Sequence, residues 1–284
     1  MRQLKLSPWA ARPLGIEFIS VFGLPPVQFI NLAADLGFRH VGMMLTPMPF
    51  NPHGYPTWSL REDAALLRET VAAMDDRGVS ISLGEGFFAR PGVDLRNSAP
   101  DLELMCQLGV KRIGTLSVDP DLNRAFDQFA VLAEMAAALG MELVVEFGPR
   151  LAISDLPTAV AAVRHVGRPN TKLLIDTMHL VRSGSTAMDL EALEPDMIGY
   201  VQLCDAPLAS KYADYVEEAK YERMLPGAGE LPLLDILAVL PPDLVIGLEV
   251  PQRALAEAGV NPHERLGRCF TAARALLARA EQNN

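Results

Sequence analysis

Four oxygen-bearing side chains each end an apolar run in the second half of the chain, and together they could hold a metal ion. The runs are Leu143-Val144-Val145-Glu146, Leu173-Leu174-Ile175-Asp176, Tyr200-Val201-Gln202 and Ile246-Gly247-Leu248-Glu249. A carboxylate buried in this way is costly unless it is paired or bound to a cation. Oxygen ligands at a site open to substrate favour Mg²⁺ or Mn²⁺, although Co²⁺ or Zn²⁺ can also bind such sites. Glu146, Asp176, Gln202 and Glu249 therefore predict one divalent metal ion.

Each of these residues, taken alone, could instead be an isolated polar side chain that meets water or caps a helix. Four of them at the ends of successive predicted strands favour a shared site. A further carboxylate, in Gly84-Glu85-Gly86, follows an earlier strand, and its glycines would let a ligand come close. A solvated turn is the competing interpretation of that segment. Glu85 is kept as a candidate substrate-binding residue.

A recurring glycine marks the elements that must position these side chains. Gly37, Gly78, Gly109, Gly140 and Gly167 each end a stretch of helical period and precede the start of an apolar run. Glycine accepts the left-handed backbone conformation that closes a helix. The intervals of 41, 31, 31 and 27 residues fit one strand, one helix and two loops. The spacing predicts consecutive βα units.

Eight short apolar or β-branched runs are predicted to be strands. They are Gly15–Val21, His40–Leu45, Val79–Leu83, Arg112–Leu116, Glu142–Phe147, Lys172–Asp176, Gly199–Leu203 and Leu244–Val250. Between the second and third, Ser59-Leu60-Arg61-Glu62 has the pattern of a capping box, which predicts the start of a helix.

The choice between a closed barrel and an open doubly wound sheet depends on where the polar residues fall. An open sheet should carry a glycine-rich phosphate loop after its first strand, and Val21-Phe22-Gly23-Leu24-Pro25-Pro26 is neither a GxGxxG sequence nor a P-loop. Polar residues instead end the later strands, as in the active sites of α/β barrels. We therefore predict an α/β fold, a single (β/α)₈ TIM barrel that forms one domain over residues 1–284.

Composition and charge exclude several classes of protein. The net charge is −10 with no Lys/Arg-rich run, which argues against nucleic acid and anionic lipid as partners. The three cysteines are widely spaced, so neither a disulfide framework nor a thiolate zinc site is expected. The segment Met1–Leu6 does not resemble a signal peptide, and no apolar stretch is long enough to span a bilayer. A cytoplasmic location is expected.

Taken in order, the residues of the second half resemble those of the xylose isomerase-like barrel superfamily, the sugar phosphate isomerase/epimerase group. The resemblance covers nearly the whole chain and is strongest from Glu146 to Glu249. The resemblance rests on the four oxygen ligands and on three further motifs. These are Asp176-Thr177-Met178-His179, Asp205 after Gln202, and the R-x-x-P-G-x-G run from Arg223 to Gly229. These motifs specify the fold strongly and the substrate weakly.

The resemblance implies roles for individual residues. Glu146, Asp176, Gln202 and Glu249 would bind the metal, with Glu146 and Glu249 also acting as the catalytic acid/base pair. His179 and Arg223 would reach substrate oxygens. Many relatives have histidine where this chain has Gln202, and an amide oxygen favours Mg²⁺ or Mn²⁺. Some dehydratases of the superfamily share this glutamine.

Arg150 follows the first glutamate by four residues and matches an arginine of the epimerases and hydroxypyruvate isomerases, so substrate binding is expected of it. Arg150 could equally be an exposed arginine of a loop with no role in substrate binding.

The reaction expected from this resemblance is isomerisation or epimerisation of a sugar or related polyhydroxy ketone through an enediolate, because a cation can neutralise the oxygen that gains charge. The small-molecule substrate is otherwise unspecified. A metal-dependent dehydratase of an inosose or of 3-dehydroshikimate is the first alternative, and a non-catalytic binding barrel the second. Five scattered histidines and the negative charge argue against a metal-dependent endonuclease.

The longest insertion between a predicted strand and its helix runs from Pro207 to Glu222. Tyrosines at positions 212, 215 and 221 alternate there with charged residues. The segment could form a lid over the site, a subunit contact in a homo-oligomer, or a solvated surface helix.

Overall fold

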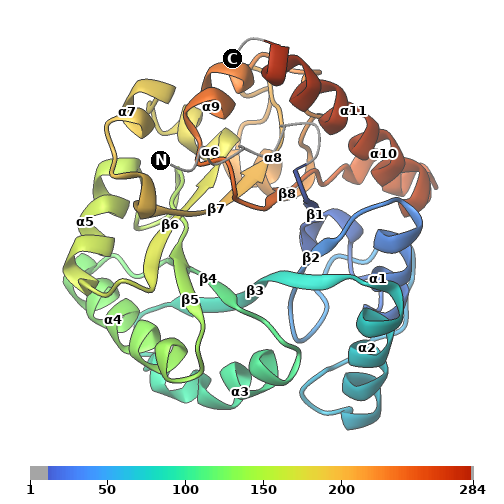
Figure 1. Ribbon diagram of the computed structural model, residues 1–284, viewed down its shortest axis with the longest axis horizontal. Coiled ribbons are helices and arrows are strands. Elements are labelled where there is room, and N and C mark those ends of the chain that lie inside the picture. The colour runs from blue at the N-terminus through green and yellow to red at the C-terminus, as the bar shows by residue number, and fades with distance from the viewer. Residues whose placement is uncertain (1–11, 283–284) are drawn as a thin grey trace, which may run out of the picture.

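Eight parallel strands close into one barrel in the computed structural model, which describes residues 12–282 (Figure 1). The strands are β1 (Leu14–Ile16), β2 (His40–Met43), β3 (Ser80–Ala89), β4 (Arg112–Ser117), β5 (Glu142–Val145), β6 (Thr171–Asp176), β7 (Ile198–Leu203) and β8 (Ile246–Leu248). Each strand pairs with the next, and β8 pairs with β1 to close the ring. The predicted (β/α)₈ barrel is confirmed. The predicted lack of a signal peptide at Met1–Leu6 concerns residues outside those described.

Helices surround this ring of strands (Figure 1). They are α1 (Pro26–Asp35), α2 (Ala64–Arg77), α3 (Ala99–Gln107), α4 (Leu122–Ala138), α5 (Leu156–Val166), α6 (Thr177–Arg182), α7 (Ala187–Glu191), α8 (Tyr215–Tyr221), α9 (Leu233–Val239), α10 (Arg253–Glu257) and α11 (Pro262–Gln282). Short 3₁₀ turns lie at η2 (Phe18–Val21), η3 (Leu95–Ser98) and η4 (Pro195–Met197). Among residues 12–282, none of the helices combines the length and the apolar character needed to cross a membrane.

The glycines that marked the predicted βα units have the backbone conformation expected of them. All five, from Gly37 to Gly167, have positive φ angles between 61° and 85°. A residue with a side chain is strained in this region, whereas glycine is not. The glycine repeat therefore ends helices, as the sequence indicated.

A small apolar cluster fills the barrel beneath the predicted site. It consists of Leu83, Val144, Leu174 and Tyr200, all buried. Side chains two residues apart on a strand point to the same face. Each cluster residue lies two positions before a predicted site residue, namely Glu85, Glu146, Asp176 or Gln202. The strand period thus directs these four polar side chains to the barrel interior, at the carboxyl ends of the strands.

Three local predictions are wrong. The first strand ends at Ile16, and η2 replaces its predicted second half. β3 continues to Ala89, so Gly84-Glu85-Gly86 lies within a strand and the solvated-turn interpretation fails. The helix expected at Ser59 begins at Ala64, because the Asp63 carboxylate accepts hydrogen bonds from the backbone N–H groups of Ala65 and Leu66.

Candidate active site

The structure brings the four predicted oxygen ligands to one end of the barrel. Asp176 ends β6 and lies in register with Gln202 on β7. Glu146 and Glu249 each follow the last residue of a strand, β5 and β8. Asp176, Gln202 and Glu249 are buried, and Glu146 is partly exposed. The four side chains therefore lie at the carboxyl ends of their strands, at one mouth of the barrel.

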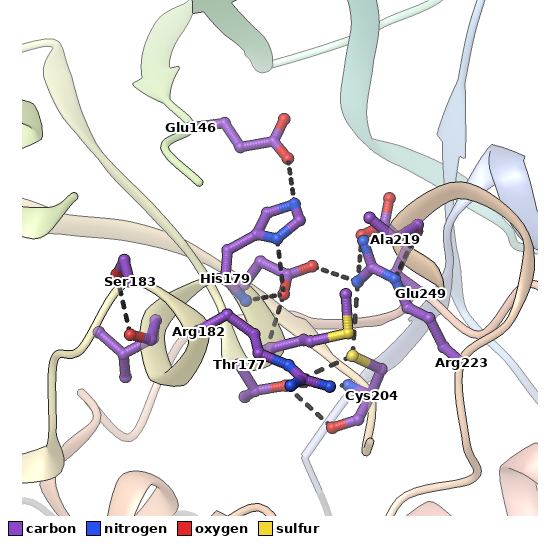
Figure 2. Close-up of polar contacts among 12 residues, drawn as sticks. Glu146, Thr177, His179, Arg182, Ser183, Cys204, Ala219, Arg223 and Glu249 are labelled. Carbon is purple, nitrogen blue, oxygen red and sulfur yellow. Dashed lines mark hydrogen bonds and ion pairs between the residues drawn. The ribbon is translucent and has the colours of Figure 1, made fainter. Parts of the chain in front are cut away.

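A buried arginine lies between two of these side chains. Arg223 is 5% exposed, and its Nη1 contacts Asp176 Oδ2 and lies 2.8 Å from Glu249 Oε2 (Figure 2). Its Nε donates to the Ala219 carbonyl at 2.7 Å, and Nη1 also lies 3.4 Å from Cys204 Sγ. The sequence placed Arg223 near the substrate, and its contact with two predicted metal ligands was not foreseen.

Arg223 and the burial of the site give Asp176 and Glu249 different pKa values. Burial raises the pKa of Asp176, but the charges of Arg223 and His179 outweigh this effect and leave the pKa below its usual value. Burial raises the pKa of Glu249 well above its usual value, against the effect of Arg223, and the nearby Asp176 carboxylate adds to the rise. These surroundings favour the charged form of Asp176 and the protonated form of Glu249.

The D-x-x-H sequence has a local structural cause. Asp176 caps α6 by accepting hydrogen bonds from the backbone N–H groups of Met178 and His179. The His179 ring then extends toward Glu146, with Nε2 3.4 Å from Glu146 Oε1 (Figure 2). Its Nδ1 lies 2.5 Å from the hydroxyl of Tyr215, which belongs to the predicted insertion. The structure thus places the His179 ring over the strand end, next to Glu146.

A pair of carboxyls at β1 and β3, Glu17 and Glu85, adds to the site. Glu17 follows β1 and is fully buried; it accepts a hydrogen bond from the Tyr200 hydroxyl at 2.7 Å and one from the Gln202 amide. Glu85 hydrogen bonds to Glu17. A Cβ atom on Gly247 would lie 1.6 Å from Glu17 Oε1, so only glycine leaves room there.

Burial dominates the proton affinities of this pair. It raises the pKa of Glu17 to about 7. Burial and the charge of Glu17 raise the pKa of Glu85 well above its usual value. The sequence analysis missed Glu17, although it ends the apolar run Leu14-Gly15-Ile16 in the same way as the four chosen ligands end theirs.

Arg150 is not among the residues at the centre of the site. It is exposed in the turn after β5, with a φ of 77°. Among residues 12–282, its side chain takes part in no hydrogen bond or ion pair with the residues of the site. Its predicted contact with substrate remains a prediction.

A small cavity opens beside Glu85, Glu146 and Gln202. Its volume is about 20 Å³, enough for one water-sized group. Glu85 Oε1 and Gln202 Oε1 are buried atoms without a hydrogen-bond partner in the described part of the chain. Such atoms are costly to leave unpaired, so this side of the site has free oxygens for a cation or a polar ligand.

The donor chemistry of the site fits a divalent cation. The site contains five carboxyls, an amide oxygen, one histidine and one buried arginine, and hard divalent ions prefer oxygen ligands. Within residues 12–282, however, no three His, Cys, Asp or Glu side chains are already arranged as a metal site. Arg223 accounts for part of this, because it is the counter-ion of Asp176 and also lies 2.8 Å from Glu249. Bound metal would have to compete with it.

The glycines of the R-x-x-P-G-x-G run leave room for the side chain of Asp205. The Asp205 carboxylate accepts hydrogen bonds from the backbone N–H groups of Gly227, Gly229 and Leu231. A Cβ atom on Gly229 would lie 2.4 Å from Asp205 Oδ1. The turn therefore folds tightly around one carboxylate, close to Arg223 in sequence.

The predicted insertion forms the short helix α8 beside the site. Glu218 of α8 accepts two hydrogen bonds of 2.9 Å from Arg182 of α6. Tyr221, at the end of α8, contacts the Phe50 ring, with centroids 5.3 Å apart. The insertion is thus packed against the barrel mouth.

The comparison with solved structures supports this fold. The chain matches a xylose isomerase-like TIM barrel/4-hydroxyphenylpyruvate dioxygenase fusion protein with a TM-score of 0.70 and 21% identity, covering 88% of this chain but 41% of the other. It matches an IOLI protein with a bound zinc atom at a TM-score of 0.76 and 15% identity, covering 95% and 98%. A D-psicose 3-epimerase crystallised in the presence of D-fructose matches at 0.67 and 17%, covering 94% and 97%. These likenesses concern the fold.

The sequence itself also matches a family model. No curated protein sequence matches the chain. The model described as xylose isomerase-like TIM barrel matches residues 30–266, which include every predicted site residue. The chain belongs to the xylose isomerase-like TIM barrel family.

Proposed function

We propose that the chain is a divalent-metal-dependent isomerase or epimerase of a sugar or related polyhydroxy ketone. Glu146 and Glu249 would be its acid/base pair. The observation that carries the proposal is their placement in unlike environments, after β5 and β8 of one barrel mouth. Glu146 lies 3.4 Å from His179 Nε2, whereas burial favours the protonated form of Glu249. Two carboxyls with separated proton affinities suit an acid and a base.

A metal ion, when bound, would neutralise negative charge that develops on a substrate oxygen. Glu146, Asp176, Gln202 and Glu249 are the side chains that would hold it. The zinc of the IOLI structure belongs to that protein but supports the expectation of a metal here. Mg²⁺ or Mn²⁺ is preferred for this chain because the proposed donors are all oxygens.

The protein residues would move the proton. Glu146 would take a proton from the carbon beside the carbonyl, and Glu249 would deliver one from its own side of the site. His179 would hold a substrate oxygen next to Glu146. The similarity in fold to a D-psicose 3-epimerase supports a ketose as the first substrate class to test.

Solvent deuterium exchange tests the proposal. The Mn²⁺-loaded protein is incubated in D₂O with ketohexoses, inososes and cyclic hydroxy ketones, and deuterium next to the carbonyl is measured by mass spectrometry. Glu146→Gln and Glu249→Gln variants that still bind Mn²⁺ should exchange about 100-fold more slowly or worse. Glu264→Gln, on the outer helix α11, should exchange at the wild-type rate. A metal-loaded glutamate variant as fast as wild type would refute the two-glutamate mechanism.

The same assay separates the alternatives. A dehydratase remains the second candidate because Gln202 occupies a position at which some dehydratases of the superfamily carry glutamine. It would release a product lighter by one water that absorbs in the near ultraviolet, whereas an isomerase yields a product of equal mass. A protein that binds Mn²⁺ but exchanges no proton with any of these compounds would be a binding barrel.

A further inference from the structure

A hydrogen bond from the inserted helix reaches the histidine of the site. Tyr215 is the first residue of α8, and its hydroxyl lies 2.5 Å from His179 Nδ1. The two ring centroids are 5.8 Å apart. Tyr215 lies about one strand and one helix away from His179 in sequence, so only the folded insertion brings them together.

The other ring nitrogen of His179 determines the direction of this hydrogen bond. Nε2 lies 3.4 Å from the Glu146 carboxylate, so it must carry a hydrogen to interact favourably with that acceptor. In a neutral imidazole, Nδ1 is then an acceptor. The Tyr215 hydroxyl can supply the hydrogen, because burial raises the pKa of this phenol above its ordinary value and keeps it protonated.

Further contacts help to place the His179 side chain. Its backbone N–H is held by the Asp176 cap at 2.9 Å. The ring lies against Gly148, where a Cβ atom would approach His179 Cγ to 2.9 Å. Nδ1 also lies 4.0 Å from Asp176 Oδ1, so the hydroxyl of Tyr215, at 2.5 Å, is the closer polar neighbour of this ring nitrogen.

We infer that Tyr215 is a positioning residue, whose hydroxyl at Nδ1 holds the His179 ring with Nε2 directed toward Glu146. This role rests on the proposed acid/base function of Glu146. In that chemistry, a fixed Nε2–H donor beside Glu146 would bind a substrate oxygen in one orientation. Tyr215 itself would not touch the reacting atoms.

Nitrogen-15 NMR of the histidine rings tests the inference without any substrate. The full-length protein, loaded with diamagnetic Mg²⁺, is labelled and measured at about pH 8.5, where an ordinary histidine is neutral. The chain has five histidines, and His179→Gln assigns the His179 signals by their loss. We expect wild-type His179 to be protonated on Nε2 alone. A hydrogen on Nδ1 in the wild-type protein would overturn the inference, and this measurement needs no Tyr215 variant to fold.

Tyr215→Phe removes the hydroxyl and keeps the ring. We expect the His179 signals to move toward a mixture of tautomers and the rate of proton exchange with substrate to fall about 10-fold or more, with a smaller change in KM. Tyr212→Phe is the matched control, because Tyr212 lies in the same insertion with its side chain 39% exposed. Unchanged His179 signals in Tyr215→Phe would overturn the inference. If the His179 signals change in Tyr215→Phe but the wild-type protein exchanges no proton with any substrate tested, the inference about Tyr215 stands and the proposed function is refuted.

Discussion

The Nη1 atom of Arg223 lies 2.8 Å from Oε2 of Glu249, and both side chains are buried at the mouth of the barrel. The same atom contacts Asp176. Both carboxyls are expected to bind metal. The Arg223 guanidinium therefore already supplies positive charge next to side chains that a metal ion would contact. Metal binding and this arginine are therefore expected to be coupled.

Replacing Arg223 with glutamine should destabilise the metal-free protein and increase its response to metal. Removing one partner of a buried ion pair costs about 3–5 kcal/mol, because the other charge stays buried without compensation. Added Mn²⁺ should raise the free energy of unfolding more in Arg223→Gln than in wild type, as measured by urea denaturation. Arg96→Gln is the control, since its pair with Asp94 is largely exposed. An equal Mn²⁺ effect in Arg223→Gln and wild type would show that arginine and metal do not compete.

The buried carboxyl of Glu17 should make the stability of the metal-free protein depend on pH. Its pKa is raised from 4.5 to about 7, so the fold favours the protonated form. The stabilisation is complete below about pH 4.5 and is lost as pH rises to about 7. The loss is up to about 3 kcal/mol, since a tenfold change in proton affinity corresponds to about 1.4 kcal/mol.

Glu17→Gln stays neutral and can still accept from Tyr200, so it should lack this loss. Urea unfolding at about pH 5 and about pH 8 compares the two proteins, with the exposed Glu264→Gln as control. The same pH dependence in Glu17→Gln and wild type would mean that Glu17 is ionised in the fold at both pH values.

The ion pair between Glu218 and Arg182 should hold α8 against the barrel. Both side chains are buried, at 1% and 9% exposure. Glu218→Gln should lower the free energy of unfolding by about 2 kcal/mol and speed hydrogen exchange in α8, because hydrogen bonds to charged groups contribute about that much. The neighbouring Glu217→Gln affects a pair with Arg253 that is partly exposed and should change either quantity little. Equal protection of α8 in both variants would argue against this anchor.

Gln202 should set the metal preference of the site. Its amide donates to Glu17, which leaves Oε1 as a buried oxygen without a partner in the described residues. Gln202→His should shift relative affinity from Mn²⁺ toward Zn²⁺ and Co²⁺, since imidazole is a softer ligand. Competition titrations measure the ratio, and Gln107→His on the exposed end of α3 controls for adventitious histidine binding. An unchanged ratio would place Gln202 outside the ligand set.

The sequence by itself determined the barrel and the strand-end side chains at its mouth. Glycines such as Gly37 and Gly167 report a local backbone requirement, and the strand period fixes the face on which Glu146 and Asp176 lie. These are short-range properties, so a pattern along the chain expresses them. Glu17 could have been found by the same rule, but its strand has three residues and gives a weak pattern.

Only the tertiary structure decided which of these groups meet. Asp176 and Arg223 are 47 residues apart, Tyr215 reaches His179 across 36, and Glu17 receives the Tyr200 hydroxyl across 183. Closing the ring sets these neighbours, because β1 comes to lie beside β8, and the insertion packs against α6. The proton affinities of Glu17 and Glu249 depend on the same closure, since burial and a nearby charge act through space and leave no trace in the spacing of residues.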